Sequence, residues 1–359
     1  RAGTYEFTLS LCGKTVSRRV ELPEGTGQGE LAVEIATPAL WWPLDYGPQS
    51  LHELAVAVAD AGGLQVAAER QRVGLRSVEL VQEPDEHGRS FFFRINGVPI
   101  FLKGYNWIPA DCFSPRMTRK VYEDLIESAA AAHCNVLRVW GGGIYEHEDF
   151  YDLCDEKGIL VWQDFMFACA MYPWDDEFLA NVAEEVLHQL RRLACHPCIF
   201  LLCGNNENEA ALDWYPETKA ARDRFLVGYH RLYLETIGRL AARERPDLPY
   251  WPSSPSNGPE EYGDPNDPTR GDVHYWRVWH GGQPFEDYLT VKPRLVSEFG
   301  FQSLPSVETL LKVMGPEDLN PSSPMMDYRQ RSQTGNQAIV AQMMHEYRLP
   351  SDFAGFVYL

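Results

Sequence analysis

The segment Ile199–Cys203 is a short apolar run that stops at Gly204 and is followed at once by amides and carboxylates, Asn205-Asn-Glu-Asn-Glu209. The run is too short for a buried helix and has no helical spacing, which predicts a buried parallel strand. Glu207 then lies just beyond the carboxyl end of that strand, where α/β barrels place their chemistry. We therefore expect an α/β fold in which the carboxyl ends of several parallel strands lie close together.

A second segment has the same design, because the run Pro293–Ser297 leads into Glu298 and then into Gly300. Cleaving a glycosidic bond needs a proton on the leaving oxygen and a carboxylate at the sugar carbon, with the two carboxyls about 5–5.5 Å apart in retaining enzymes. Glu207 and Glu298 are so distant in the chain that only a closed sheet brings them together. Either glutamate alone would more often be a solvated loop carboxylate.

The N-terminal part, residues 1 to about 80, is predicted to be an antiparallel sandwich, because Thr4–Leu11 and Leu51–Ala59 alternate in polarity. The polar run Gln82–Arg89 is interpreted as a linker. Phe91–Pro99 follows as a hairpin with Asn96-Gly97 at its turn. We therefore expect two domains, 1–80 and 81–359.

The second domain alternates strands and helices, which favours a parallel sheet and, with so many units, a barrel. Thr118 is expected to cap the first helix and Gly158 to end the second. The strands are predicted at Ile100–Tyr105, Asn135–Trp140, Ile159–Asp164, Ile199–Cys203, Tyr250–Ser253, Asp272–Tyr275 and Arg294–Ser297. The helices are predicted at Thr118–Ala132, up to Lys157, at Asp175–Leu193, Glu217–Arg245 and Asn336–Arg348.

Three motifs, Gly204–Glu209, Val136–Gly143 and Ser297–Ser303, together resemble the β-mannosidase branch of glycoside hydrolase family 2, and the likeness runs from about Ala39 to the C-terminus. The resemblance implies an immunoglobulin-like β-sandwich followed by a (β/α)8 TIM barrel. It also implies a retaining, exo-acting hydrolase that removes terminal β-linked mannose through a covalent glycosyl-enzyme, without a metal or other cofactor.

The family pattern also contains an N-terminal sugar-binding sandwich and, after the last helix, an eighth strand. Neither is recognised in this chain, whose last residues are Ala354–Leu359. We therefore expect the middle of a longer enzyme, with a barrel truncated before its last strand. The open edges of such a barrel invite association, and the chain by itself should have little or no activity.

By match to the family motifs, Glu207 is the general acid/base and Glu298 the nucleophile. Asn206, as in the family, is expected to hydrogen-bond the sugar 2-hydroxyl. Arg138 can hold Glu298 ionised, or it can form a structural salt bridge. Glu209 is more typical of a loop or helix-start carboxylate than of the acid.

Trp140 precedes Gly141-Gly-Gly143 and can form an aromatic wall for the sugar, while the glycines allow close approach of the ligand to the backbone. The spacing of a nucleotide-binding GxGxxG is absent. His274 and Trp276 are expected to line the same pocket, with Asp164 as a weaker candidate of the same kind. Each of these residues alone would more often be a packed core residue.

The composition of the chain argues against two kinds of binding partner, nucleic acid and membrane. The net charge of −19 repels phosphate backbones and argues against nucleic acid, and the longest apolar runs are too short to span a membrane. Of the eight cysteines, Cys195-His-Pro-Cys198 invites a zinc or redox interpretation, but no second CxxC accompanies it. The sequence has no Asn-X-Ser/Thr acceptor, which favours a bacterial cytoplasm.

Two alternatives remain for the function. One is another family 2 activity, a β-galactosidase, β-glucuronidase or exo-β-glucosaminidase, whose substrates carry an equatorial 2-substituent where mannose has an axial one. The other is a fragment that only binds sugar or does not fold alone, which the missing eighth strand favours. The oligomeric state is not predicted.

Overall fold

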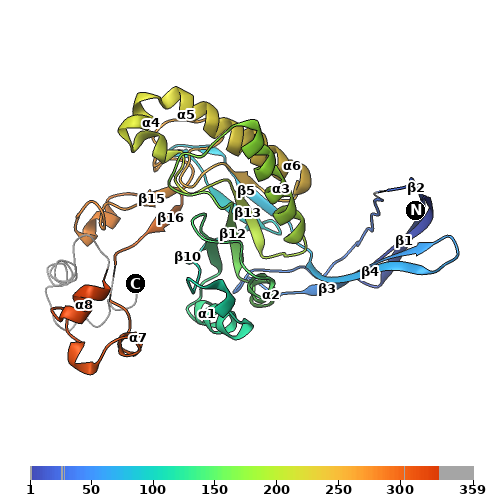
Figure 1. The fold of residues 1–359 in the computed structure, drawn as a ribbon, viewed down its shortest axis with the longest axis horizontal. Helices are drawn as coiled ribbons and strands as arrows, with labels where there is room; N and C mark the ends of the chain where they lie inside the picture. The colour runs from blue at the N-terminus through green and yellow to red at the C-terminus, as the bar shows by residue number, and fades with distance from the viewer. Residues whose placement is uncertain (1, 26, 28, 303, 331–359) are drawn as a thin grey trace. The chain divides into compact units, whose positions relative to one another are not determined.

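The computed structural model describes residues 2–330 except 26, 28 and 303 (Figure 1). The chain divides into two compact units, Arg1–Asp272 and Val273–Leu359, which are described separately. Predicted elements at Asn336–Arg348 and Ala354–Leu359 lie outside the described residues. The expected division into 1–80 and 81–359 stays a prediction.

The N-terminal residues form one antiparallel sheet of order β2-β1-β3-β4. Its strands are β1 (Gly3–Leu11), β2 (Lys14–Leu22), β3 (Leu51–Asp60) and β4 (Gln65–Gly74). Leu9 lies opposite Val16 on one side and Val56 on the other, so one face collects the apolar side chains. The β-structure is confirmed, but among the described residues of 23–50 there is no strand that would begin a second sheet. The sandwich therefore stays a prediction.

The polar run Gln82–Arg89 is not a free linker, contrary to the prediction. Its residues form two short antiparallel strands, β6 (Pro84–Asp85) and β7 (Gly88–Arg89). The Arg89 guanidinium pairs with Glu261 at 2.6 Å, and its backbone N–H donates to the carbonyl of Thr269 at 2.9 Å. A partner far along the chain thus orders a segment whose composition is typical of a linker.

The predicted hairpin after this run is confirmed, with β8 (Phe92–Ile95) and β9 (Val98–Ile100) pairing antiparallel and β5 (Val78–Val81) on the other side of β8. Asn96 and Gly97 both have positive φ, 52° and 78°, which is the requirement of a type I′ turn. The buried ring of Phe93 packs edge-on against Phe200, 4.8 Å between centroids, so this small sheet covers part of the parallel sheet.

A five-stranded parallel sheet of order β10-β11-β12-β13-β14 forms the centre of the first unit. Both β12 and β13 are buried at every position, as their unbroken apolar runs predict. Within the described residues β10 is an edge strand and its side chains are largely exposed. The strands are β10 (Gly104–Trp107), β11 (Val136–Val139), β12 (Leu160–Asp164), β13 (Ile199–Cys203) and β14 (Tyr250–Trp251).

Helices α1 (Arg119–Ala131), α2 (Glu148–Lys157) and α3 (Asp176–Arg192) connect these strands. Gly158 ends α2 with φ 75°, as predicted, because a left-handed residue is needed there. Thr118 occupies the first position before α1, but its side chain makes no capping hydrogen bond, so that detail of the prediction is wrong.

The predicted single helix Glu217–Arg245 is also wrong. It is divided into α4 (Pro216–Ala220), α5 (Arg222–Tyr229), a π-helical segment η3 (His230–Gly238) and α6 (Arg239–Glu244). Ala221 leaves helical geometry with φ −127° and ψ 33°. In the π-helical segment the Tyr250 hydroxyl donates to the carbonyl of Tyr233 at 2.5 Å, and such an insertion into the hydrogen-bond ladder widens a helix.

The second unit contains a parallel strand pair, β15 (Val273–Tyr275) and β16 (Val296–Phe299). These are the predicted sixth and seventh strands. Helices α7 (Val307–Leu311) and α8 (Pro324–Arg329) contribute Leu310 and Met326 to a small apolar core. Among the helices described in either unit, none has the length and apolar character that crossing a bilayer requires.

The cap at Gly158 yields a stability test. A Cβ at Gly158 would lie 2.7 Å from the Leu44 backbone nitrogen, whereas at Gly13, which also has φ 75°, nothing lies within 4 Å. Gly13→Ala measures the left-handed backbone alone and should cost about 1 kcal/mol. Gly158→Ala should cost about 1–3 kcal/mol more in urea unfolding, because packing is also disturbed. Equal costs for the two variants would contradict this account.

Candidate active site

Asn206 and Glu207 follow β13 and are held by both neighbouring chain segments. Asn206 forms parallel bridges with Ala168 and with Ser254, and the Glu207 backbone N–H donates to the Ser254 carbonyl at 2.8 Å. Glu207 is half-buried and has φ 62°, an unfavourable left-handed conformation for a glutamate. Strain of this kind persists only where surrounding structure enforces it, and it is common at functional sites. The strand end thus presents Glu207 in a fixed backbone geometry.

Arg138 of β11 and Asp164 at the end of β12 form a buried ion pair. Arg138 Nη2 lies 2.9 Å from Asp164 Oδ2, and both side chains are at most 5% exposed. Burial raises the pKa of Asp164, while Arg138 and N–H donors from Gly141 and Trp162 oppose that rise. The salt bridge, one of the two roles expected for Arg138, is therefore present in the first unit. A pairing with Glu298 would join the two units and stays a prediction.

The same guanidinium orients Asn206. Arg138 Nη2 donates to Asn206 Oδ1 at 2.8 Å, and Nη1 donates to Asn106 Oδ1 at 3.1 Å. The other end of the Asn206 amide donates to the sulfur of Cys169 at 3.3 Å, and that thiol lies 3.5 Å from Glu207 Oε2. Arg138, Asp164, Asn206 and Glu207, all predicted from sequence, are thus brought together.

Sequence reasoning missed Cys169. It lies five residues beyond the end of β12, in a loop that no motif covers. The bridge between Ala168 and Asn206 and the hydrogen bond from the Cys169 backbone N–H to the Asn206 carbonyl bring its thiol to the site, and no local signal in the sequence predicts these contacts.

Trp140 is half-buried at the start of the glycine run, and the glycines are closely packed within the protein itself. A Cβ at Gly142 would lie 2.0 Å from the Trp140 ring, and one at Gly141 would lie 2.5 Å from the Phe167 carbonyl. These glycines therefore permit close packing between parts of the protein, and the expected approach of a ligand to their backbone stays a prediction. The predicted stacking of Trp140 on a sugar stays a prediction.

In the second unit, the structure places His274 and Trp276 around Glu298. The Trp276 indole N–H donates to Glu298 Oε2 at 3.3 Å, and His274 Nδ1 lies 3.3 Å from the same oxygen. His274 and Glu298 are direct partners in the register of β15 and β16. Glu298 is 7% exposed. These three predicted residues therefore form one cluster in which two ring nitrogens fix the orientation of a carboxylate.

Glu209 begins the short 3-10 helix η2 (Ala210–Asp213), in agreement with the expected helix start. It is buried, and its Oε2 accepts hydrogen bonds from Ser256 Oγ at 2.8 Å and Tyr229 OH at 3.1 Å. Burial raises the pKa of Glu209 to about 7, although both hydroxyl donors oppose the rise. Glu209 is thus a structural carboxyl that carries a proton over much of the acidic range.

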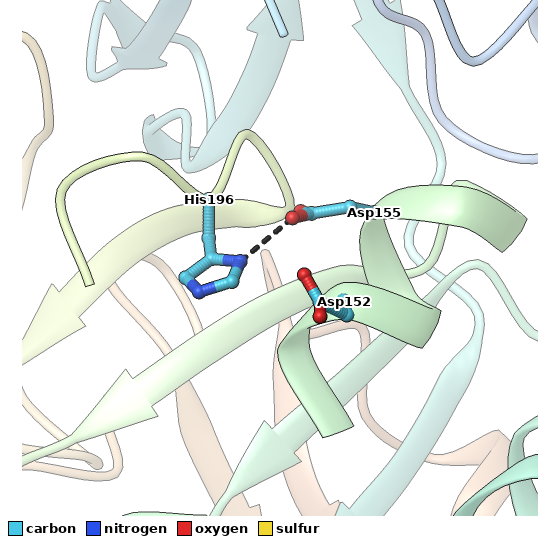
Figure 2. Close-up of side chains that lie close together, drawn as sticks. All are labelled: Asp152, Asp155 and His196. Atoms are coloured by element: carbon cyan, nitrogen blue, oxygen red, sulfur yellow. Dashed lines mark hydrogen bonds and ion pairs between the residues drawn. The ribbon is translucent and has the colours of Figure 1, made fainter. Parts of the chain in front are cut away.

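Asp152, Asp155 and His196 lie close together, as Figure 2 shows, and one ligand atom from each lies within 4.8 Å of the others. This spacing suits a metal ion, but the histidine is already engaged. His196 Nδ1 lies 2.7 Å from Asp155 and Nε2 3.1 Å from Glu148. Burial alone would lower the pKa of His196, but hydrogen bonds to Asp155 and Cys195 raise it to about 10. We interpret the cluster as an imidazolium between carboxylates that fastens α2 to the segment before β13.

The Cys195-x-x-Cys198 motif gains no support as a zinc or redox site. Cys198 is fully buried with its sulfur 3.8 Å from the Tyr151 carbonyl, and burial raises the pKa of its thiol well above the usual range. Metal binding and redox chemistry need the thiolate. All eight cysteines of the chain are free thiols.

The carboxyl ends of parallel strands thus carry an acid, an amide and a buried ion pair, which defines an α/β protein with a cluster of polar side chains at that edge of the sheet. The chain is a homologue of the β-mannosidases over most of its length. It is 41% identical over 348 residues to a β-mannosidase of Bos taurus, covering 93% of this chain and 39% of that protein. It is 36% identical over 366 residues to β-mannosidase B of Aspergillus niger, covering 99% and 42%.

The fold of the chain is also similar to that of a solved β-mannosidase structure. The crystal structure of a β-D-mannosidase from Dictyoglomus thermophilum matches with a TM-score of 0.88 at 39% identity, covering 99% of this chain and 44% of that one. The chain therefore spans about two fifths of the length of the curated relatives it matches. No protein-family model matches the chain. The resemblance stated from the three motifs is confirmed as homology.

The buried state of Glu209 predicts a pH-dependent stability. Between its ordinary pKa of 4.5 and the folded value of about 7, the unfolded chain loses the proton while the folded chain keeps it, so this group lowers stability as pH rises. Glu209→Gln removes the effect and should stabilise the protein by about 1–3 kcal/mol at pH 8 relative to pH 4.5. Urea unfolding at both pH values measures this.

Glu217→Gln, at an exposed position in α4, is the matched control and should show no such difference. An equal effect of Glu209→Gln at both pH values would contradict the buried, protonated state.

Proposed function

We propose that the protein carrying this chain is a retaining exo-β-mannosidase that removes terminal β-linked mannose from its substrates. The observation that supports this most strongly is the pair of strand-end glutamates, each with its own set of polar partners, in a homologue of β-mannosidases. We also propose that the antiparallel sheet belongs to an immunoglobulin-like sandwich and the parallel strands to a (β/α)8 barrel, which the match to the Dictyoglomus enzyme supports.

In the proposed mechanism Glu207 gives its proton to the leaving glycosidic oxygen while a carboxylate oxygen of Glu298 bonds to the anomeric carbon and the glycosidic bond breaks. Glu207, now ionised, then takes a proton from water. The water oxygen bonds to the anomeric carbon as its bond to Glu298 breaks, which restores both side chains. Each carboxyl acts in both steps, so neither can be replaced by an amide.

Asn206 is proposed to contact the sugar 2-hydroxyl. Its Oδ1 is already engaged by Arg138 and one amide N–H donates to Cys169, so the second amide N–H is the part that we assign to a ligand. A donor at this place suits the hydroxyl oxygen, and such contacts strengthen as the transition state forms. Trp140, His274 and Trp276 are proposed to complete the sugar pocket.

We propose mannose as the sugar of the substrate, and not the sugars of other family 2 enzymes, because the relatives at 36% to 41% identity are named β-mannosidases. A reducing compartment such as the cytoplasm is proposed because all eight cysteines are free. The alternative for the 359-residue chain alone is a fragment that binds sugar without turnover, and it is favoured by β10, which is an edge strand within the described residues and has largely exposed side chains. A panel of nitrophenyl β-glycosides, assayed on the full-length protein and on this chain, tests both points.

The roles of the two glutamates predict distinct variants of the full-length protein. Glu207→Gln and Glu298→Gln should each lower kcat by at least about a thousandfold, whereas Glu209→Gln should keep most of the turnover. Glu207→Ala should still form the glycosyl-enzyme from substrates with activated leaving groups, because these need little protonation. Azide should then accelerate its release. If Glu298→Ala behaved in this way instead, the two roles would be reversed.

The double displacement predicts retention of configuration. Proton NMR of the first product from a nitrophenyl β-mannoside should show the β-anomer before mutarotation. Initial appearance of the α-anomer would contradict the mechanism while leaving the substrate assignment intact.

A further inference from the structure

Cys169 occupies a constrained place beside the proposed acid/base. Its φ is 55°, so two residues with left-handed backbone, Cys169 and Glu207, lie on neighbouring segments. The Cys169 backbone N–H donates to the Asn206 carbonyl at 2.9 Å, and Ala168 forms a parallel bridge with Asn206. The backbone therefore fixes where the thiol lies.

The thiol is a link in a continuous chain of hydrogen bonds. Arg138 Nη2 donates to Asp164 Oδ2 at 2.9 Å and to Asn206 Oδ1 at 2.8 Å. The Asn206 amide nitrogen faces the Cys169 sulfur at 3.3 Å, and the sulfur faces Glu207 Oε2 at 3.5 Å. Asn206 can only donate to the sulfur, because its oxygen is turned to Arg138. The S–H is then directed to the carboxyl group of Glu207.

We propose that Cys169 is a positioning residue that fixes the carboxyl group of Glu207 for proton transfer to the leaving oxygen. The proposal rests on the proposed function of Glu207. No bond to sulfur forms or breaks, since the proton passes from Glu207 to the leaving group and later from water to Glu207. The thiol only orients the carboxyl in both states.

If Cys169 positions Glu207, the effect of removing the thiol on the rate should depend on the leaving group, whereas a simple packing role gives no such dependence. Poor leaving groups need full protonation by Glu207, whereas dinitrophenolate leaves without it. Loss of the thiol should therefore slow only the first class of substrate. A packing defect that disturbs the whole site would slow both classes alike.

The experiment measures kcat/KM of the full-length protein and its variants for a methyl and a 2,4-dinitrophenyl glycoside of whichever β-linked sugar it hydrolyses. Cys169→Ala should lower kcat/KM for the methyl glycoside about tenfold and leave that for the dinitrophenyl glycoside within twofold. Cys169→Ser, which keeps a hydroxyl donor, should recover most of the loss. Cys12→Ala is the matched control, because Cys12 has φ 51° and is exposed in the N-terminal hairpin.

Equal losses for both substrates, or no loss for either, would overturn the proposal. If Cys169→Ala does not fold, the folded parent protein treated with methyl methanethiosulfonate gives the same comparison, with the Cys169→Ser variant treated in parallel to subtract reaction at other cysteines. The proposed function fails separately, if the untreated protein hydrolyses no β-mannoside. The inference on Cys169 fails if turnover is normal and the leaving-group dependence does not change.

Discussion

The buried ion pair between Arg138 and Asp164 organises the carboxyl edge of the parallel sheet. Removing one partner of such a pair leaves an uncompensated buried charge and typically costs about 3–5 kcal/mol. Here the pair also connects strands, because Arg138 lies on β11, Asp164 ends β12, and the guanidinium reaches Asn206 beyond β13. Three consecutive strand ends are thus locked by one guanidinium. A lysine could not replace it, because only a planar fork supplies several directed N–H donors.

A chain of hydrogen bonds connects this ion pair to the proposed acid/base. Arg138 donates to the Asn206 side-chain oxygen and so orients the amide. The Asn206 amide N–H donates to the Cys169 sulfur, and that thiol lies against the carboxyl group of Glu207. The left-handed backbone at Cys169 and Glu207 is tolerated because both segments are hydrogen-bonded to their neighbours. Strain and hydrogen bonds therefore act together to present a carboxyl group in a single geometry.

The two glutamates have different surroundings, which is what the proposed chemistry requires. Glu298 lies against an indole and an imidazole nitrogen, whereas Glu207 lies against a thiol, a much weaker donor. An acid and a nucleophile of the same residue type differ only through their environments. Composition alone does not show this difference, which depends on the side chains that surround each glutamate at its strand end.

The sequence by itself determined the elements whose causes are local. The apolar run before Gly204 predicted β13, Gly158 predicted the end of α2, and Asn96-Gly97 predicted the hairpin turn, because backbone conformation at these places depends on the residues themselves. The motifs also identified Glu207 and Glu298 as candidates, and homology to β-mannosidases followed. These features need no knowledge of distant contacts.

Only the tertiary structure decided the rest. The helix expected at 217–245 is broken and widened where Tyr250 reaches Tyr233, and the polar run before Arg89 is ordered through Glu261. Cys169 joins the site through a bridge to Asn206 that no local pattern encodes. In each case the deciding partner lies from 17 to 172 positions away in the chain, and a hydrogen bond or ion pair between residues so separated exists only once the fold has brought them together.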